Sequence, residues 1–148
     1  MSAGPHLAAL LAPFTDPADP RGHRFVDVPA DIAARVLEVV DQATADSRPN
    51  GEQPPMRWLV TVAGELDARL VGSLSHGYLR FDGIQVQGRP AWSALLARLA
   101  RDWSSASTHA VAEVWDGWDA LLPRWAGRAS AADSEMQSDD DVLGLWWD

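Results

Sequence analysis

The strongest structural signal in this chain is the ten-residue stretch YLRFDGIQVQ, residues 78–87. It consists of two apolar runs, residues 78–81 and 84–87, with the pair Asp82-Gly83 between them. An Asp-Gly pair between two such runs is typical of a tight β-hairpin. We therefore expect two antiparallel strands with their turn at Asp82-Gly83.

Further strands are expected on both sides of this hairpin. In residues 56–63, one face of an alternating pattern carries Met, Trp and two Val, which predicts a strand that ends at Gly64. Residues 69–71 form a second short run before a glycine. Residues 109–115 alternate well enough to be a strand, although their alanines also suit a helix. Consecutive strands joined by short turns indicate a mainly antiparallel sheet.

Two segments have the period of a helix. Residues 29–44 begin with Pro29 and Asp31, which suit the first turn of a helix. Their apolar residues follow at offsets 0, 4, 7, 8 and 11: Ile32, Val36, Val39, Val40 and Ala43. Residues 90–103 carry a second stripe at offsets 0, 3, 4, 7 and 11: Trp92, Leu95, Leu96, Leu99 and Trp103.

Together these elements predict an α+β fold, with a mainly antiparallel sheet of about four to five strands and two principal helices packed on it. The first 25 residues are expected to form one or two helical turns and a loop. Residues 46–55 and 104–108 are expected to be polar connections. We predict a single domain over residues 1–128 and an acidic tail, residues 129–148, that ends in an apolar Trp-Trp anchor.

Composition excludes several kinds of protein. With 148 residues and 47% hydrophobic side chains, the chain suits one domain with a substantial core. No apolar run approaches the roughly 18–20 residues of a membrane span, and the start lacks the basic residues of a secretion signal. The absence of cysteine excludes disulfides, thiolate metal sites and cysteine nucleophiles. We expect a cytoplasmic protein that does not contact the membrane.

The net charge of −9 is unevenly distributed. Residues 129–148 hold six acidic residues and no basic one, so the rest of the chain is close to balanced. Because binding to a phosphate backbone requires clustered basic residues, nucleic acid is not expected as a partner. Another protein with a basic surface fits this charge better.

Motifs for nucleotide and metal chemistry are missing. The chain has no lysine for a phosphate loop, and no two of its histidines (6, 23, 76 and 109) lie within five residues of each other. We expect neither a cofactor nor a metal ion. Residues 73–77, SLSHG, come close to the nucleophile elbow of hydrolases but lack its first glycine and its strand-then-helix context. A polar hairpin turn is the preferred interpretation.

Five of the eight tryptophans lie between residues 92 and 125, where they alternate with acidic residues. Acids beside aromatic walls can bind a small ligand or acquire a raised pKa, and sugars stack on tryptophan faces. The same residues equally suit core packing and a solvated turn. The candidate pocket consists of His109, Glu113, Trp115, Asp116, Trp118 and Asp119.

The C-terminal segment suggests a docking peptide. Acidic residues that steer toward a basic patch precede apolar ones that would fill a pocket. The candidate contacts are Asp139, Asp140, Asp141, Leu145, Trp146 and Trp147. The alternative is that the two tryptophans fold back and cover the domain's own core. Since two adjacent exposed tryptophans would favour aggregation, this alternative is slightly preferred.

The segment Trp115-Asp116-Gly117-Trp118, together with the helix expected before it, resembles a Trp-Asp/Glu-Gly-Trp/Tyr segment of uncharacterised proteins from high-GC actinobacteria. The resemblance covers about residues 90–120. It implies a bacterial origin, in line with the use of arginine for all twelve basic residues. It implies no activity and no site.

From these observations we predict a non-catalytic, acidic protein-binding module, such as an immunity- or antitoxin-like inhibitor or a dedicated chaperone. The alternative is a small-ligand-binding protein or an enzyme, for example one directed at carbohydrate, that uses the tryptophan-rich residues 92–125.

Overall fold

The computed structural model describes residues 4–48, 52–115, 124–128 and 139–147. The helices are α1 (Gly4–Leu11), the short 3₁₀ helix η1 (Ala12–Phe14), α2 (Ala30–Val39), α3 (Gln42–Asp46), α4 (Met56–Leu66), α5 (Arg89–Asp102) and α6 (Ser104–His109). The strands are β1 (Arg24–Pro29), β2 (Arg69–Ser75), β3 (Tyr78–Gln87), β4 (Val111–Trp115), β5 (Arg124–Arg128) and β6 (Val142–Trp146). The α+β class is therefore confirmed.

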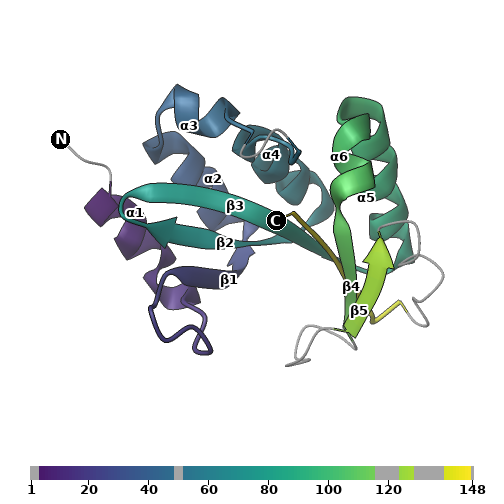
Figure 1. Cartoon of the computed structure of the whole chain (residues 1–148), viewed down its shortest axis with the longest axis horizontal. Coiled ribbons are helices and arrows are strands. Elements are labelled where there is room, and N and C mark those ends of the chain that lie inside the picture. Colours follow the sequence, from purple (N-terminus) through teal and green to yellow (C-terminus); the bar gives the residue numbers. More distant parts are fainter. Residues whose placement is uncertain (1–3, 49–51, 116–123, 129–138, 148) are drawn as a thin grey trace.

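In the described part of the chain, six strands form one sheet in the order β1-β2-β3-β6-β4-β5. Every neighbouring pair is antiparallel. Figure 1 shows α2 and α4 above the long strand β3, with α3 farther out, and α5 and α6 at the end of the sheet that carries β4 and β5. The last strand of the chain, β6, lies between β3 and β4 and so joins the two halves of the sheet.

One face of the sheet packs against the helices and forms the core. Leu70, Ile84, Leu145 and Ala112 lie opposite one another on four successive strands, and all four are almost fully buried. Because side chains alternate along a strand, this register places every second residue of each strand in the core. A single apolar cluster runs from Leu7 in α1 to the C-terminal strand.

The predicted hairpin turn at Asp82-Gly83 is wrong. The strand β3 continues through both residues, and the turn lies instead at His76-Gly77, where φ is +53° and +78°. Two positive φ values in a two-residue loop match the twist of the flanking strands. The polar hairpin turn expected within residues 73–77 is thus confirmed.

At Asp82-Gly83 the chain forms a β-bulge, because the pairing with β2 shifts between Val71 and Gly72. A side chain cannot replace the hydrogen of Gly83, since a Cβ there would lie 2.5 Å from Cγ2 of Val71. The glycine of this Asp-Gly pair is therefore required for close packing between strands and not for a turn of the chain. Sequence alone does not separate these two uses of glycine.

The strand predicted for residues 56–63 is also wrong, because this segment forms the helix α4. Its buried residues follow a helical period: Met56, Leu59, Val60, Val62 and Ala63. The sequence also fits an alternating pattern, but that pattern would bury Trp58, which is only half-buried. Pro55 precedes the helix, and Asp67 ends it in the left-handed conformation with φ of +52°.

The two helices predicted from periodicity are present as α2 and α5. In α2 the buried residues are Ala33 and Val36, whereas Ala43 lies beyond the helix and is exposed. The polar connection expected at residues 104–108 is instead the helix α6. No helix in the described part of the chain has the length and apolar composition of a membrane span.

Candidate functional site

The C-terminal segment folds back onto its own domain. Trp147 is 1% exposed, and its ring Nε1 donates a hydrogen bond of 2.9 Å to the carbonyl oxygen of Ala106 in α6. Its backbone N–H donates to the carbonyl of Asp82 in β3, and its own carbonyl accepts a bond from Arg80. Leu145 is likewise buried in the core. These two anchor residues fill the protein's own interior, so the docking interpretation would require β6 to leave the sheet.

The other predicted tail residues differ in exposure. Asp139 and Asp140 are exposed, Asp141 is buried, and Trp146 is half-buried. The carbonyl of Asp141 accepts a hydrogen bond of 3.0 Å from the N–H of Gly88, the residue before α5. We expected the domain to end at residue 128 and a tail to follow. The C-terminal strand β6 nevertheless belongs to the sheet of the domain, because it pairs with β3 and β4.

The alternative pocket is only partly within the described residues. His109 ends α6, is exposed, and its Nδ1 lies 3.9 Å from an oxygen of the half-buried Glu52. Glu113 and Trp115 belong to β4, but their side chains are not described. Asp116, Trp118 and Asp119 lie outside the described residues. In the part that is described, no three His, Asp or Glu side chains come together in a way that could hold a metal ion.

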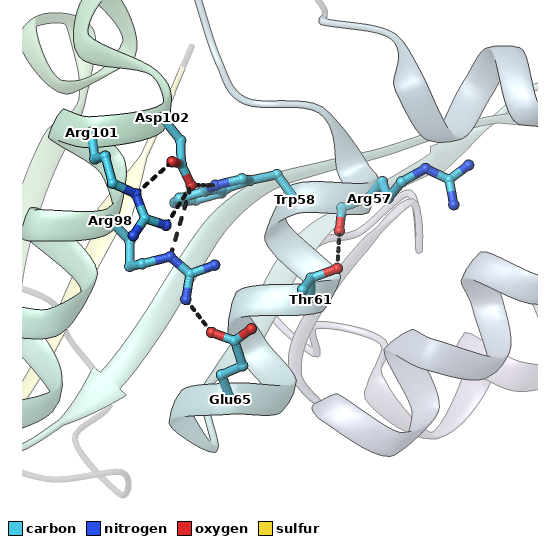
Figure 2. A network of polar contacts seen from close by, with 7 residues as sticks. All are labelled: Arg57, Trp58, Thr61, Glu65, Arg98, Arg101 and Asp102. Carbon is cyan, nitrogen blue, oxygen red and sulfur yellow. Dashed lines mark hydrogen bonds and ion pairs between the residues drawn. The ribbon is translucent and has the colours of Figure 1, made fainter.

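A polar network that sequence reasoning missed connects α4 with α5 (Figure 2). Trp58 Nε1 donates to Oδ2 of Asp102 at 2.9 Å, and Arg101 Nε donates to Oδ1 at 2.8 Å. Arg98 approaches the same carboxylate at 3.8 Å and forms an ion pair with Glu65 of α4. The pattern Arg-x-x-Arg-Asp near the end of α5 could have indicated a polar network. Its partner in α4 was not expected, because residues 56–63 were predicted to form a strand.

In this network an acid lies beside a tryptophan, but neither Asp102 nor Trp58 belongs to the candidate pocket of the sequence analysis, and the electrostatics of Asp102 differ from those of a catalytic acid. The hydrogen bond from Arg101 and that from Trp58 lower the pKa of Asp102 from 3.8 to about 2. A proton donor at neutral pH needs a raised pKa. Asp102 stays ionised, which suits a link between two helices.

The N-terminal helix leaves an apolar hollow of about 370 Å³ beside α2. Leu7 and Leu11 point into the core, whereas Leu10 and Phe14 remain half-buried. The hollow is lined by His6, Ala9, Leu10, Pro13, Phe14, Ile32 and Arg35. The sequence does carry a sign of this hollow: α1 and η1 have apolar residues on more than one side, and so short a segment cannot bury all of them in the core.

The exposed charge beyond the ion pairs is mostly acidic. Five arginines pair with acids: Arg24–Asp82, Arg57–Asp46, Arg69–Asp27, Arg98–Glu65 and Arg101–Asp102. Arg48 and Arg80 donate to Gln53. Among the acids whose side chains the structure describes, Asp31, Glu38, Asp67 and Asp139 are exposed and have neither an ion pair nor a side-chain hydrogen bond. Among the arginines whose side chains are described, the same holds for Arg21 and Arg35.

We compared the chain with protein-family models, with curated proteins and with solved structures, and none of the three comparisons gave a match.

Proposed function

We propose that this chain is a non-catalytic module that binds another protein through an acidic surface, and that the partner presents a basic one. The observation that supports the proposal is a contrast between the two signs of charge. Most described arginines contact acids or backbone groups within the molecule. Four acids instead face solvent: Asp31, Glu38, Asp67 and Asp139. A surface of one sign attracts and orients a partner of the other sign.

Two features of the described residues support a binding role over a catalytic one. The acid whose pKa is most clearly displaced is Asp102, and its pKa is lowered by partners that hold it ionised. The two hollows described are lined mainly by apolar side chains and hold no acidic residue. Immunity- or antitoxin-like inhibitors and dedicated chaperones are the classes of small acidic protein that this role suits. We place its action in the cytoplasm of a bacterium.

The test is retention of host proteins on the immobilised full-length chain, with the retained proteins identified by mass spectrometry. We expect a protein with a basic surface to be retained at low salt and largely released by 0.5 M NaCl, since exposed charges are screened. The variant Asp31→Asn/Glu38→Gln/Asp67→Asn should retain less of it. No retained protein, or retention that neither salt nor this variant changes, would refute the proposal.

A further inference from the structure

We infer that His23 and His76 form a two-histidine site for a divalent transition-metal ion such as Zn²⁺ or Ni²⁺. The two residues are far apart in the sequence, so a search for closely spaced histidines does not find them. The fold places His23 just before β1 and His76 in the turn between β2 and β3, with their ring centres 6.1 Å apart. Imidazole nitrogens are the commonest protein ligands of such metals. The inference does not depend on the proposed function.

The separation of the two rings suits a shared metal ion. A ring nitrogen binds Zn²⁺ at about 2.0–2.1 Å, so two imidazoles on one ion have their ring centres about 5–6 Å apart. The rings of His23 and His76 are close to this separation and are inclined at 61° to each other. His76 is exposed and His23 is half-buried, so small rotations of both side chains can bring one nitrogen of each ring to a common point.

The backbone holds both histidines in place. The N–H of His23 donates a hydrogen bond of 2.9 Å to the carboxylate of Asp19, and its carbonyl accepts one of 2.8 Å from the N–H of Leu74 in β2. His76 occupies a tight two-residue turn with Gly77, where its φ is +53°. Ligands on a fixed backbone lose less conformational entropy when a metal binds, which favours binding.

Charge and access around the pair also suit a cation. Asp19 interacts electrostatically with His23 and brings a negative charge to the site. The guanidinium of the adjacent Arg24 is paired with Asp82 at 2.8 Å. His23 also lines a second hollow, of about 280 Å³. No third His, Asp or Glu completes a ligand cluster within the described residues, so water would fill the remaining positions on the ion.

Titration of the full-length ¹⁵N-labelled chain with NiCl₂ tests the site, because paramagnetic Ni²⁺ broadens the NMR signals of amides near it. We expect the amides of residues 22–24 and 74–77 to broaden first, before those around His6 and His109. Calorimetric titration with ZnCl₂ then gives the affinity and should show one ion per chain. Broadening that begins at His6 or His109, or no broadening at all, would overturn the inference.

Matched variants show whether both rings bind the ion. His23→Gln and His76→Asn each remove one imidazole, and asparagine tolerates the positive φ at residue 76. Each should weaken Zn²⁺ binding at least about tenfold, since the loss of even an indirect partner of a metal site costs about 10–100-fold. The controls are His6→Gln and His109→Gln, and the second of these removes the histidine that lies 3.9 Å from Glu52. Both controls should leave the affinity unchanged. Unchanged affinity in His23→Gln or in His76→Asn would contradict a shared site.

Stability measurements separate loss of the site from loss of the fold. Without metal, the midpoint of urea denaturation should differ little between the parent chain and these variants, because none of the four histidines is buried. An ion that binds the folded state stabilises it. Zn²⁺ should therefore raise the midpoint of the parent chain and of both controls, but not that of His23→Gln or His76→Asn. An equal rise in all five chains would refute the inference.

Discussion

At the scale of single residues, Trp147 links segments of the chain that are distant from it in the sequence. Its ring lies in the core, its Nε1 binds the carbonyl of Ala106, and its backbone binds Asp82 and Arg80. These partners belong to α6 and β3, which lie far apart in the sequence. The tryptophan therefore stabilises tertiary structure near the C-terminus.

We predict that Trp147→Ala lowers the free energy of unfolding by about 3–5 kcal/mol, because it removes a large buried ring and leaves a cavity. Trp147→Phe should cost less, about 1–3 kcal/mol, mainly through the carbonyl of Ala106 that loses its donor. Urea denaturation measures both. Tyr78→Ala is the control, because Tyr78 is 56% exposed and its replacement should change stability little. Equal costs for Trp147→Ala and Tyr78→Ala would contradict burial of Trp147.

At the scale of elements, the contact between α4 and α5 depends on a carboxylate that is ionised over an unusually wide pH range. The pKa of Asp102 is lowered to about 2, first by the hydrogen bond from Arg101 and then by that from Trp58. A lowered pKa in the folded state means that the unfolded chain binds more protons between about pH 2 and pH 4. The stabilisation by Asp102 is thus fully present above pH 4 and is lost as the pH falls toward 2.

We predict that Asp102→Asn is less stable than the parent chain at neutral pH and that this difference shrinks steadily between pH 4 and pH 2. Urea denaturation of both chains across this range isolates Asp102 from the other carboxylates that titrate there. At 0.5 M NaCl the difference at neutral pH should be smaller, because the network lies at the surface. A difference that stays constant down to pH 2 would show that the network does not form in solution.

The elements also show where pattern reasoning succeeds and where it fails. The stripe of α5 has a single interpretation, since Trp92, Leu95 and Leu99 fit a helix and no strand. The segment 56–63 fits both periods, and α4 forms because its residues pack against α2 and the sheet. The position of the hairpin turn was ambiguous in the same way. Two glycine-containing pairs were available, and strand packing decided that His76-Gly77 turns and Asp82-Gly83 bulges.

At the scale of the whole molecule, the strand that closes the fold is the last one in the chain. Without β6, the described strands β3 and β4 would each lose a neighbour, because β6 pairs with both. Its core side chains are Leu143, Leu145 and the adjoining Trp147, all almost fully buried. Burial of each large apolar side chain contributes roughly 1.5–3 kcal/mol, which together is comparable to the net stability of a domain.

We therefore predict that a chain truncated after residue 141 does not fold cooperatively. Near-ultraviolet circular dichroism should lose its tryptophan signal, and urea should give no sharp transition. Asp139→Asn, which changes the charge of the same segment without removing the strand, should unfold like the parent chain. A truncated chain with an unchanged denaturation midpoint would show that β6 is not part of the sheet.

The sequence by itself determined the α+β class, the helices α2 and α5, the turn at residues 73–77 and the acidic balance of charge. All of these follow from local periodicity, turn residues or composition, which do not depend on distant contacts. Only the tertiary structure decided that residues 56–66 are helical, that Trp147 is internal and that α1 leaves a hollow beside α2. Each of these three features depends on which surfaces of the chain meet in the folded protein. An apolar side chain gains about the same free energy when it is buried against its own chain as when it is buried against a partner, so its sequence does not tell which of the two will cover it.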